Sequence, residues 1–184
     1  MKTAICPGSF DPITLGHLDI IRRASLMFDR VIVAVLVNPG KNPSFTAEER
    51  LDMIRRVVRD LPNVDAECFD GLLADYARLK NAHAIVKGLR AVTDFEYEFQ
   101  MALINRKLNP ETDTVFLTTS SRYLYLSSSM VKSIACFGGD ISDFVPACIC
   151  SEISERLCRA DAAGNLTEGW KENFTIFITN KGDN

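Results

Sequence analysis

Strand and helix patterns alternate along this chain from its first residues, and this alternation limits the fold more than any other feature. Residues 30–37 are almost continuously apolar, as in a strand that is covered on both faces. We expect further strands at about 2–6, 64–69, 84–87 and 114–118, and helices at about 16–28, 46–59, 72–79, 92–108, 128–137 and 146–158. This order predicts an α/β fold, a Rossmann-like, doubly wound, five-stranded parallel sheet with helices on both faces.

Length, charge and hydropathy limit the number of domains and the classes of partner. The chain has 184 residues, enough for a domain with a core, and we expect one domain over 1–158 and a flexible C-terminal tail over 159–184. The net charge of −3 gives no global basic field to recruit nucleic acid. No apolar run approaches the roughly 20 residues that span a membrane. A strand pattern follows the first residues directly, so we expect no signal peptide and a cytoplasmic protein.

The six cysteines need an explanation, because an even number is typical of disulfide-bonded secreted chains. Nothing else indicates secretion, so reduced and mostly buried thiols are the expectation. Zinc is poorly supported, since the chain has two histidines and Cys148-x-Cys150 is its only close cysteine pair. We therefore predict no metal ligands among the side chains.

The segment from Cys6 to His17 carries the strongest chemical signal. A short apolar run enters a turn rich in Gly and Pro, which ends at Thr14-x-Gly16-His17, where a helix pattern begins. Such a strand–loop–helix unit points backbone N–H groups and a helix dipole at one spot, which favours an anion. His17 adds a donor, and its hydrogen bond to a phosphoryl oxygen would strengthen as negative charge develops. Ser9 is a second candidate contact, whereas Phe10 fits packing or contact with a base or sugar.

Three further cations follow predicted strands. Lys41 lies in the loop after the second strand, Lys87 at the end of the fourth, and Arg90 in the following Gly88-Leu89-Arg90. Ligands of open α/β sheets bind outside the carboxyl ends of the strands, so these cations and His17 would meet at one edge. Ser127, Ser128 and Ser129 precede a helix that contains Lys132 and offer a second phosphate cradle.

Each of these residues also has a plainer interpretation. His17 could be a capping or surface residue, Ser9 a turn hydroxyl, and the Ser127–Ser129 run an N-cap. Each single cation is typically a solvated charge. Glu98 shares a helix face with Asp94, and a solvent-facing carboxylate is the simpler interpretation without further context.

Together these motifs resemble the nucleotidylyltransferase superfamily that carries T/H-x-G-H, and most closely its phosphopantetheine adenylyltransferase family. The resemblance covers about residues 2–158. Four segments carry it: Pro7–His17, Phe45–Arg50, Gly88–Glu98 and Ser127–Lys132. The Gly88–Glu98 block, G-L-R-A-V-T-D-F-E-Y-E, is the most specific of the four.

The resemblance implies transfer of AMP from ATP to 4′-phosphopantetheine, giving dephospho-coenzyme A and pyrophosphate. It also implies Mg²⁺ bound through the ATP phosphates, feedback inhibition by coenzyme A, and a homohexamer. Carried over by position, the catalytic residues are His17, Lys41 and Arg90, and the substrate site is Ser9, Lys41, Leu73 and Lys87. The implied ATP site is Ser9, Phe10, His17, Gly88, Leu89, Arg90, Glu98, Tyr123, Leu124, Tyr125, Leu126, Ser127, Ser128 and Ser129.

This chain departs from the family pattern in two places, and three alternative functions remain open. Position 87 is Lys where the family pattern has Arg, so the charge is kept but the bidentate geometry is lost, and the tail after residue 158 matches nothing in that pattern. A nucleotidyltransferase for nicotinamide mononucleotide or glycerol phosphate is the nearest rival, and a non-catalytic nucleotide sensor comes from another class. Aminoacyl-tRNA synthetases share the glycine–histidine element, but this chain is short and acidic for holding tRNA.

Overall fold

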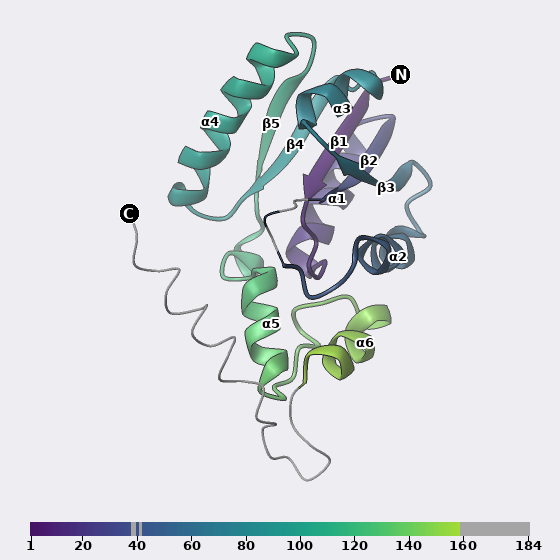
Figure 1. Ribbon diagram of the computed structural model, residues 1–184, viewed down its shortest axis with the longest axis vertical. Coiled ribbons are helices and arrows are strands. Elements are labelled where there is room, and N and C mark those ends of the chain that lie inside the picture. Colours follow the sequence, from purple (N-terminus) through teal and green to yellow (C-terminus); the bar gives the residue numbers. More distant parts are fainter. Residues whose placement is uncertain (38–39, 41, 159–184) are drawn as a thin grey trace.

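The computed structural model describes residues 1–37, 40 and 42–158 (Figure 1). Lys41 and the tail over 159–184 therefore lie outside the described residues. Within the described part, five parallel strands form one sheet in the order β3-β2-β1-β4-β5, which confirms the predicted doubly wound fold. The elements are β1 (Thr3–Gly8), α1 (Leu15–Met27), β2 (Arg30–Val37), α2 (Ala47–Val58), β3 (Val64–Asp70), α3 (Leu73–Leu79), β4 (Ala84–Leu89), α4 (Val92–Leu108), β5 (Asp113–Thr118), the short 3₁₀ helix η1 (Ser121–Tyr123), α5 (Ser128–Cys136) and α6 (Ala147–Leu157).

The central strands bury both of their faces. In β2, Val31 and Val33 join a large apolar core with residues of α1, α2, α5 and α6, while Ile32 and Ala34 join a smaller core with α3. This alternation explains why the sequence of β2 is apolar at nearly every position. No helix in the described part of the chain has the length and hydropathy to cross a membrane.

The order of the strands places a crevice between β1 and β4. The two strands pair only through Ala4 with Ala84 and Ile5 with Ile85, whereas β1 stays paired with β2 as far as Gly8. Past Ile5 and Ile85 the two neighbours are no longer paired. This is the switch point at which a doubly wound sheet binds its ligands, because the chain leaves β1 and β4 toward opposite sides.

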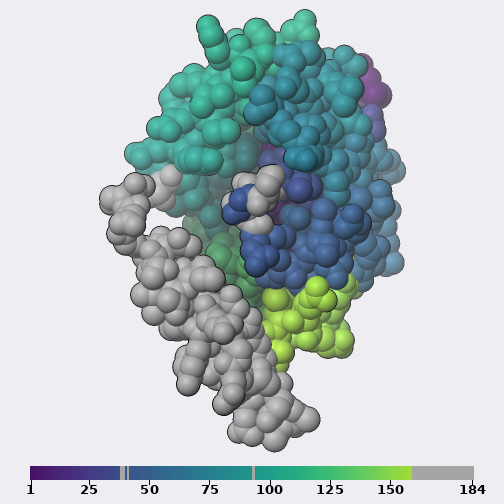
Figure 2. All heavy atoms as spheres, in the orientation of Figure 1, coloured from purple at the N-terminus to yellow at the C-terminus, as the bar shows by residue number. Residues whose placement is uncertain are grey.

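Helix α4 has the predicted bounds, but its apolar side chains face outward. Phe95 is 41% exposed, Phe99 45% and Leu103 55%, and the rings of Phe95 and Phe99 stack with their centroids 5.5 Å apart. Figure 2 shows α4 on the outer surface of the molecule. The helical spacing of these residues therefore does not mark a face that is buried within this chain.

The prediction that the cysteines are mostly buried is wrong. All six are free thiols, but only Cys6 is buried; Cys68 and Cys148 are exposed, and the other three are partly exposed. Cys68 lies in the predicted strand on the same face as the buried Val64 and Ala66. It is exposed because it sits toward the end of an edge strand, where its Sγ donates to the Ala47 carbonyl at 3.5 Å.

Candidate active site

A cavity of about 750 Å³ opens at the carboxyl ends of β1 and β4. Its wall is built from the loop after β1, the first turns of α1, the end of β4, one face of α4, and the N-terminus of α5. Most of the predicted site residues meet here: Ser9, Phe10, His17, Lys87, Gly88, Arg90, Glu98, Leu126, Ser127, Ser128 and Ser129.

Five predicted residues do not line this cavity. Leu73 is the first residue of α3 and is partly buried against the smaller core. Leu89 lies within β4, which runs two residues past its predicted end at Lys87. Tyr123, Leu124 and Tyr125 lie in and after η1, and Tyr123 packs against the main core behind the N-terminus of α1. The assignment of these five residues to the ATP and substrate sites stays a prediction.

His17 is fixed as a neutral hydrogen-bond donor. It is the third residue of α1, and its Nδ1 accepts the backbone N–H of Thr14 at 3.0 Å. A backbone N–H can only donate, so the ring proton of the neutral imidazole lies on Nε2. Burial, together with the nearby positive charge of Arg90, lowers the pKa of His17 to about 4. His17 therefore fits both the capping and the ligand-binding interpretation, because one ring nitrogen caps the helix and the other offers a donor.

The turn before His17 is held by close packing. Phe10 has a φ of 47°, and its ring meets the His17 ring edge-on with centroids 5.1 Å apart. A side chain at Gly8 would meet the Phe10 ring at 3.0 Å, so this position has no room for a Cβ. Phe10 is 4% exposed, which favours packing as its main role, although one part of it lines the cavity.

The two described cations of the cavity both have carboxylate partners. Lys87 Nζ lies 3.0 Å from Glu98 Oε1, and both side chains are largely buried. Arg90 Nε donates to Asp94 Oδ2 at 3.2 Å, and Arg90 NH1 donates to the Leu126 carbonyl at 3.0 Å. Asp94 and Glu98 occupy successive turns of α4 and so present their carboxylates to the same cavity. An anion that enters must compete with these carboxylates.

The start of α5 forms another part of the wall, beside the loop after β1. The Ser127 hydroxyl accepts the backbone N–H of Met130 at 3.1 Å and is therefore an N-cap, as the plainer interpretation holds. The Ser128 hydroxyl donates to the Pro12 carbonyl at 2.8 Å. Since the Ser127–Ser129 segment also lines the cavity, the N-terminal end of the helix dipole lies at this wall and favours an anion there.

Sequence reasoning missed several residues of this region. Asp94, Tyr97 and Cys6 line the cavity. Asp94 lies four residues before Glu98 and three before Tyr97 on one helix, and this spacing is a usable signal for a shared face. Asp11 and Arg50 do not line it, but both are buried and bind its loops. A buried charge has no signature in a single sequence, since it depends on partners that only the fold supplies.

No group of three or more His, Cys, Asp or Glu side chains in the described part of the chain is arranged to hold a metal ion. Asp94 and Glu98 are the carboxylates nearest to a ligand in the cavity, and both are engaged by cations.

The fold and this cavity define a class: a nucleotidylyltransferase of the cytidylyltransferase-like kind, whose family model matches residues 5–134. A nicotinic acid mononucleotide adenylyltransferase from Plasmodium falciparum, solved in complex with NaAD, has the same fold with a TM-score of 0.62. That chain is 15% identical, and the match covers 84% of this chain and 96% of the Plasmodium chain.

Relatives with high sequence identity define the family more narrowly than the solved structures do. Phosphopantetheine adenylyltransferase of Caldanaerobacter subterraneus subsp. tengcongensis is 57% identical over 157 residues, covering 85% of this chain and 98% of that protein. The phosphopantetheine adenylyltransferase of Alkaliphilus metalliredigens is 59% identical over 156 residues, covering 85% and 99%. This chain belongs to the phosphopantetheine adenylyltransferase family.

Proposed function

We propose that this protein transfers the adenylyl group of ATP to 4′-phosphopantetheine, which gives dephospho-coenzyme A and pyrophosphate. The observation that carries the proposal is the meeting of His17, Lys87 and Arg90 with the N-terminus of α5 around one cavity, in a chain 57% identical to a phosphopantetheine adenylyltransferase. These groups all favour negative charge, and both substrates are phosphates.

The reaction is an in-line displacement at the α-phosphorus of ATP. An oxygen of the phosphopantetheine phosphate forms the new P–O bond, and the bond from the α-phosphorus to the oxygen bridging the β-phosphorus breaks, so pyrophosphate leaves with that electron pair. The attacking oxygen is already anionic at neutral pH and requires no general base. Cys6 is no candidate nucleophile, because burial raises the pKa of its thiol to about 12.

The residues of the cavity then have distinct tasks. His17, uncharged near neutral pH, donates from Nε2 to a phosphoryl oxygen on which negative charge grows in the transition state. Arg90 and the α5 N-terminus bind the ATP phosphates, and Lys87 binds the phosphate of the acceptor. The resemblance places Lys41 at the same phosphate, and this remains a prediction. Mg²⁺, bound through the ATP phosphates, would offset charge on the pyrophosphate leaving group.

The wider assignments belong to the same proposal. Coenzyme A contains the phosphopantetheine unit and an adenine nucleotide, so it would occupy the same cavity and inhibit the enzyme. A homohexamer and a cytoplasmic location, both implied by the resemblance, are part of this proposal. The exposed apolar side chains of α4 support self-association, since exposed apolar surface is typical of subunit contacts. Light scattering on the purified chain would give the number of subunits directly.

The deciding experiment measures pyrophosphate release from ATP and Mg²⁺ with 4′-phosphopantetheine, with nicotinamide mononucleotide, and with no acceptor. Release with phosphopantetheine only is the expected result. Release with nicotinamide mononucleotide only would assign the chain to a sister activity, and ATP binding without release would favour a nucleotide sensor.

A further inference from the structure

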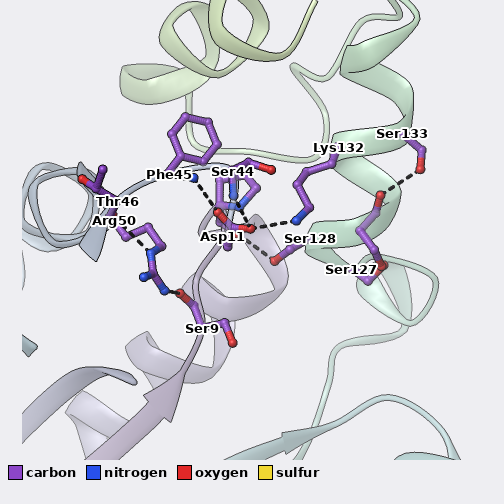
Figure 3. A network of polar contacts seen from close by, with 12 residues as sticks. Ser9, Asp11, Ser44, Phe45, Thr46, Arg50, Ser127, Ser128, Lys132 and Ser133 are labelled. Atoms are coloured by element: carbon purple, nitrogen blue, oxygen red, sulfur yellow. Dashed lines mark hydrogen bonds and ion pairs between the residues drawn. The ribbon is translucent and has the colours of Figure 1, made fainter. Parts of the chain in front are cut away.

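A network of buried polar contacts lies behind the cavity wall (Figure 3). At its centre is Asp11, whose side chain is 9% exposed. Its carboxylate accepts the backbone N–H groups of Ser44 and Phe45 at 3.1 and 3.0 Å. The same carboxylate accepts a hydrogen bond from Lys132 Nζ at 2.7 Å. Asp11 therefore joins the loop after β1 to the segment before α2 and to α5.

Two more contacts strengthen the same connections. The Ser128 hydroxyl donates to the Pro12 carbonyl at 2.8 Å, a second link between α5 and the loop after β1. On the other side, the guanidinium of Arg50 donates to the Ser9 carbonyl at 2.7 Å and to the Thr46 carbonyl at 3.2 Å. The loop after β1 is thus held from both sides by charged groups that are mostly buried.

The cavity wall includes the neighbours of these groups but not the groups themselves. Ser9, Phe10 and Thr14 line the cavity on one side and Ser127–Ser129 on the other, whereas Asp11, Arg50 and Lys132 do not line it. The ammonium group of Lys132 is directed at Asp11, although the sequence places this lysine beside the Ser127–Ser129 phosphate cradle.

We propose that Asp11 and Lys132 are positioning residues, whose ion pair fixes the loop that leads to His17 relative to the N-terminus of α5. This inference rests on the proposed function, because these two walls would hold the phosphates between them. In-line transfer requires the reacting groups to be held closely, and a displacement of about 1 Å can lower the rate by about 10²-fold. The lysine acts through Asp11 and not by contact with the nucleotide.

The test is a double-mutant cycle on pyrophosphate release at saturating ATP and 4′-phosphopantetheine. Lys132→Met and Asp11→Asn each remove one charge of the pair with little change in size. We expect each to lower kcat by about 10-fold or more while the KM for ATP changes by less than about threefold. The double variant should be no slower than the slower single variant, because both changes break one interaction. Lys132→Arg keeps a cation and should recover most of kcat.

Lys2→Met is the matched control, since it removes an exposed lysine at the opposite end of β1 from the cavity and should leave kcat unchanged. Thermal unfolding of each variant shows whether it is folded at the assay temperature. If Lys132→Met does not fold, Asp11→Asn and Lys132→Arg provide the same comparison, because Asn keeps an acceptor for a backbone N–H and Arg keeps the charge.

Three results would overturn the positioning role. A KM for ATP that rises more than about 10-fold on Lys132→Met, in the wild type and the Asp11→Asn background alike, would make Lys132 a direct phosphate ligand. An unchanged kcat in folded variants of lower thermal stability would leave the pair a structural role only. A wild-type chain that releases no pyrophosphate overturns the proposed function and the positioning role together, whereas an active wild type with unchanged variants overturns the positioning role alone.

Discussion

Acidification should destabilise this protein in part through His17. Burial and the charge of Arg90 lower the pKa of this ring from 6.5 to about 4 in the folded state. The unfolded chain therefore binds a proton between these two pH values that the folded chain does not. Stability from this group is fully present above pH 6.5 and is lost as the pH falls toward 4.

The size of the effect follows from the two pKa values. Between pH 7 and pH 4.5 the linkage relation gives a loss of roughly 2–3 kcal/mol, and the partial exposure of the ring places the value near the lower end. Urea unfolding of the wild type and His17→Asn at both pH values, at one protein concentration, isolates this contribution. The asparagine can still accept the N–H of Thr14 but does not titrate. We expect the wild type to lose about 2 kcal/mol more than the variant.

An NMR titration measures the pKa of His17 independently of unfolding. The chain has two histidines, so the His83→Gln variant shows which signal belongs to His17. The His17 signal should titrate near pH 4, and Arg90→Met should move its midpoint upward, since a nearby positive charge would be removed. A midpoint near 6.5, or equal losses of stability in the wild type and His17→Asn, would refute the claim that the fold holds this ring neutral.

Three further predictions follow from the geometry. His17→Ala should lower kcat by on the order of 10²-fold or more with a smaller effect on ATP affinity; a kcat within about threefold of the wild type would contradict its role. Gly88→Ala should destabilise the fold by roughly 1–3 kcal/mol, because the new Cβ would lie 2.8 Å from Ile20 Cγ1. In urea unfolding, Gly88→Ala/Ile20→Ala should lose less than the sum of the two single changes. Phe99→Asp should reduce the number of subunits seen by light scattering, whereas the same substitution at Leu26, an exposed apolar residue of α1, should not.

The sequence predicts most of the architecture, because strands and helices follow from local periodicity. The long helix over 92–108 and the strand over 30–37 have the bounds that the pattern indicates. The sequence Thr46-x-x-Glu49 is a local signal of the same kind and forms a capping box: the Thr46 hydroxyl accepts the N–H of Glu49, and the Glu49 carboxylate accepts the N–H of Thr46. All of these features depend on residues that lie within a few positions of one another.

Features that depend on distant partners are not predictable in this way. Periodicity marks an apolar side of α4, but it cannot tell a face that packs in the core from one left exposed. It likewise places Cys68 in a strand without revealing that the strand lies at the edge of the sheet. The buried carboxylate of Asp11 is the clearest case, since its partner Lys132 is 121 residues away.

The electrostatics of the cavity differ most from what the sequence suggests. The sequence suggests that Lys87 and Arg90 are free to bind an anion. In the structure Glu98 and Asp94 pair with them, and His17 carries no charge near neutral pH. The cavity thus holds two ion pairs, and a bound phosphate shares each cation with a carboxylate of α4 or displaces that carboxylate, since an ammonium has three donors and a guanidinium five. A displaced carboxylate of α4 then needs new donors, which the hydroxyl and amino groups of a nucleoside can supply. On this argument Asp94, the partner of the ATP-binding Arg90, favours a phosphate that carries a nucleoside over a bare anion, so a paired charge contributes to selectivity where a free cation would give affinity alone.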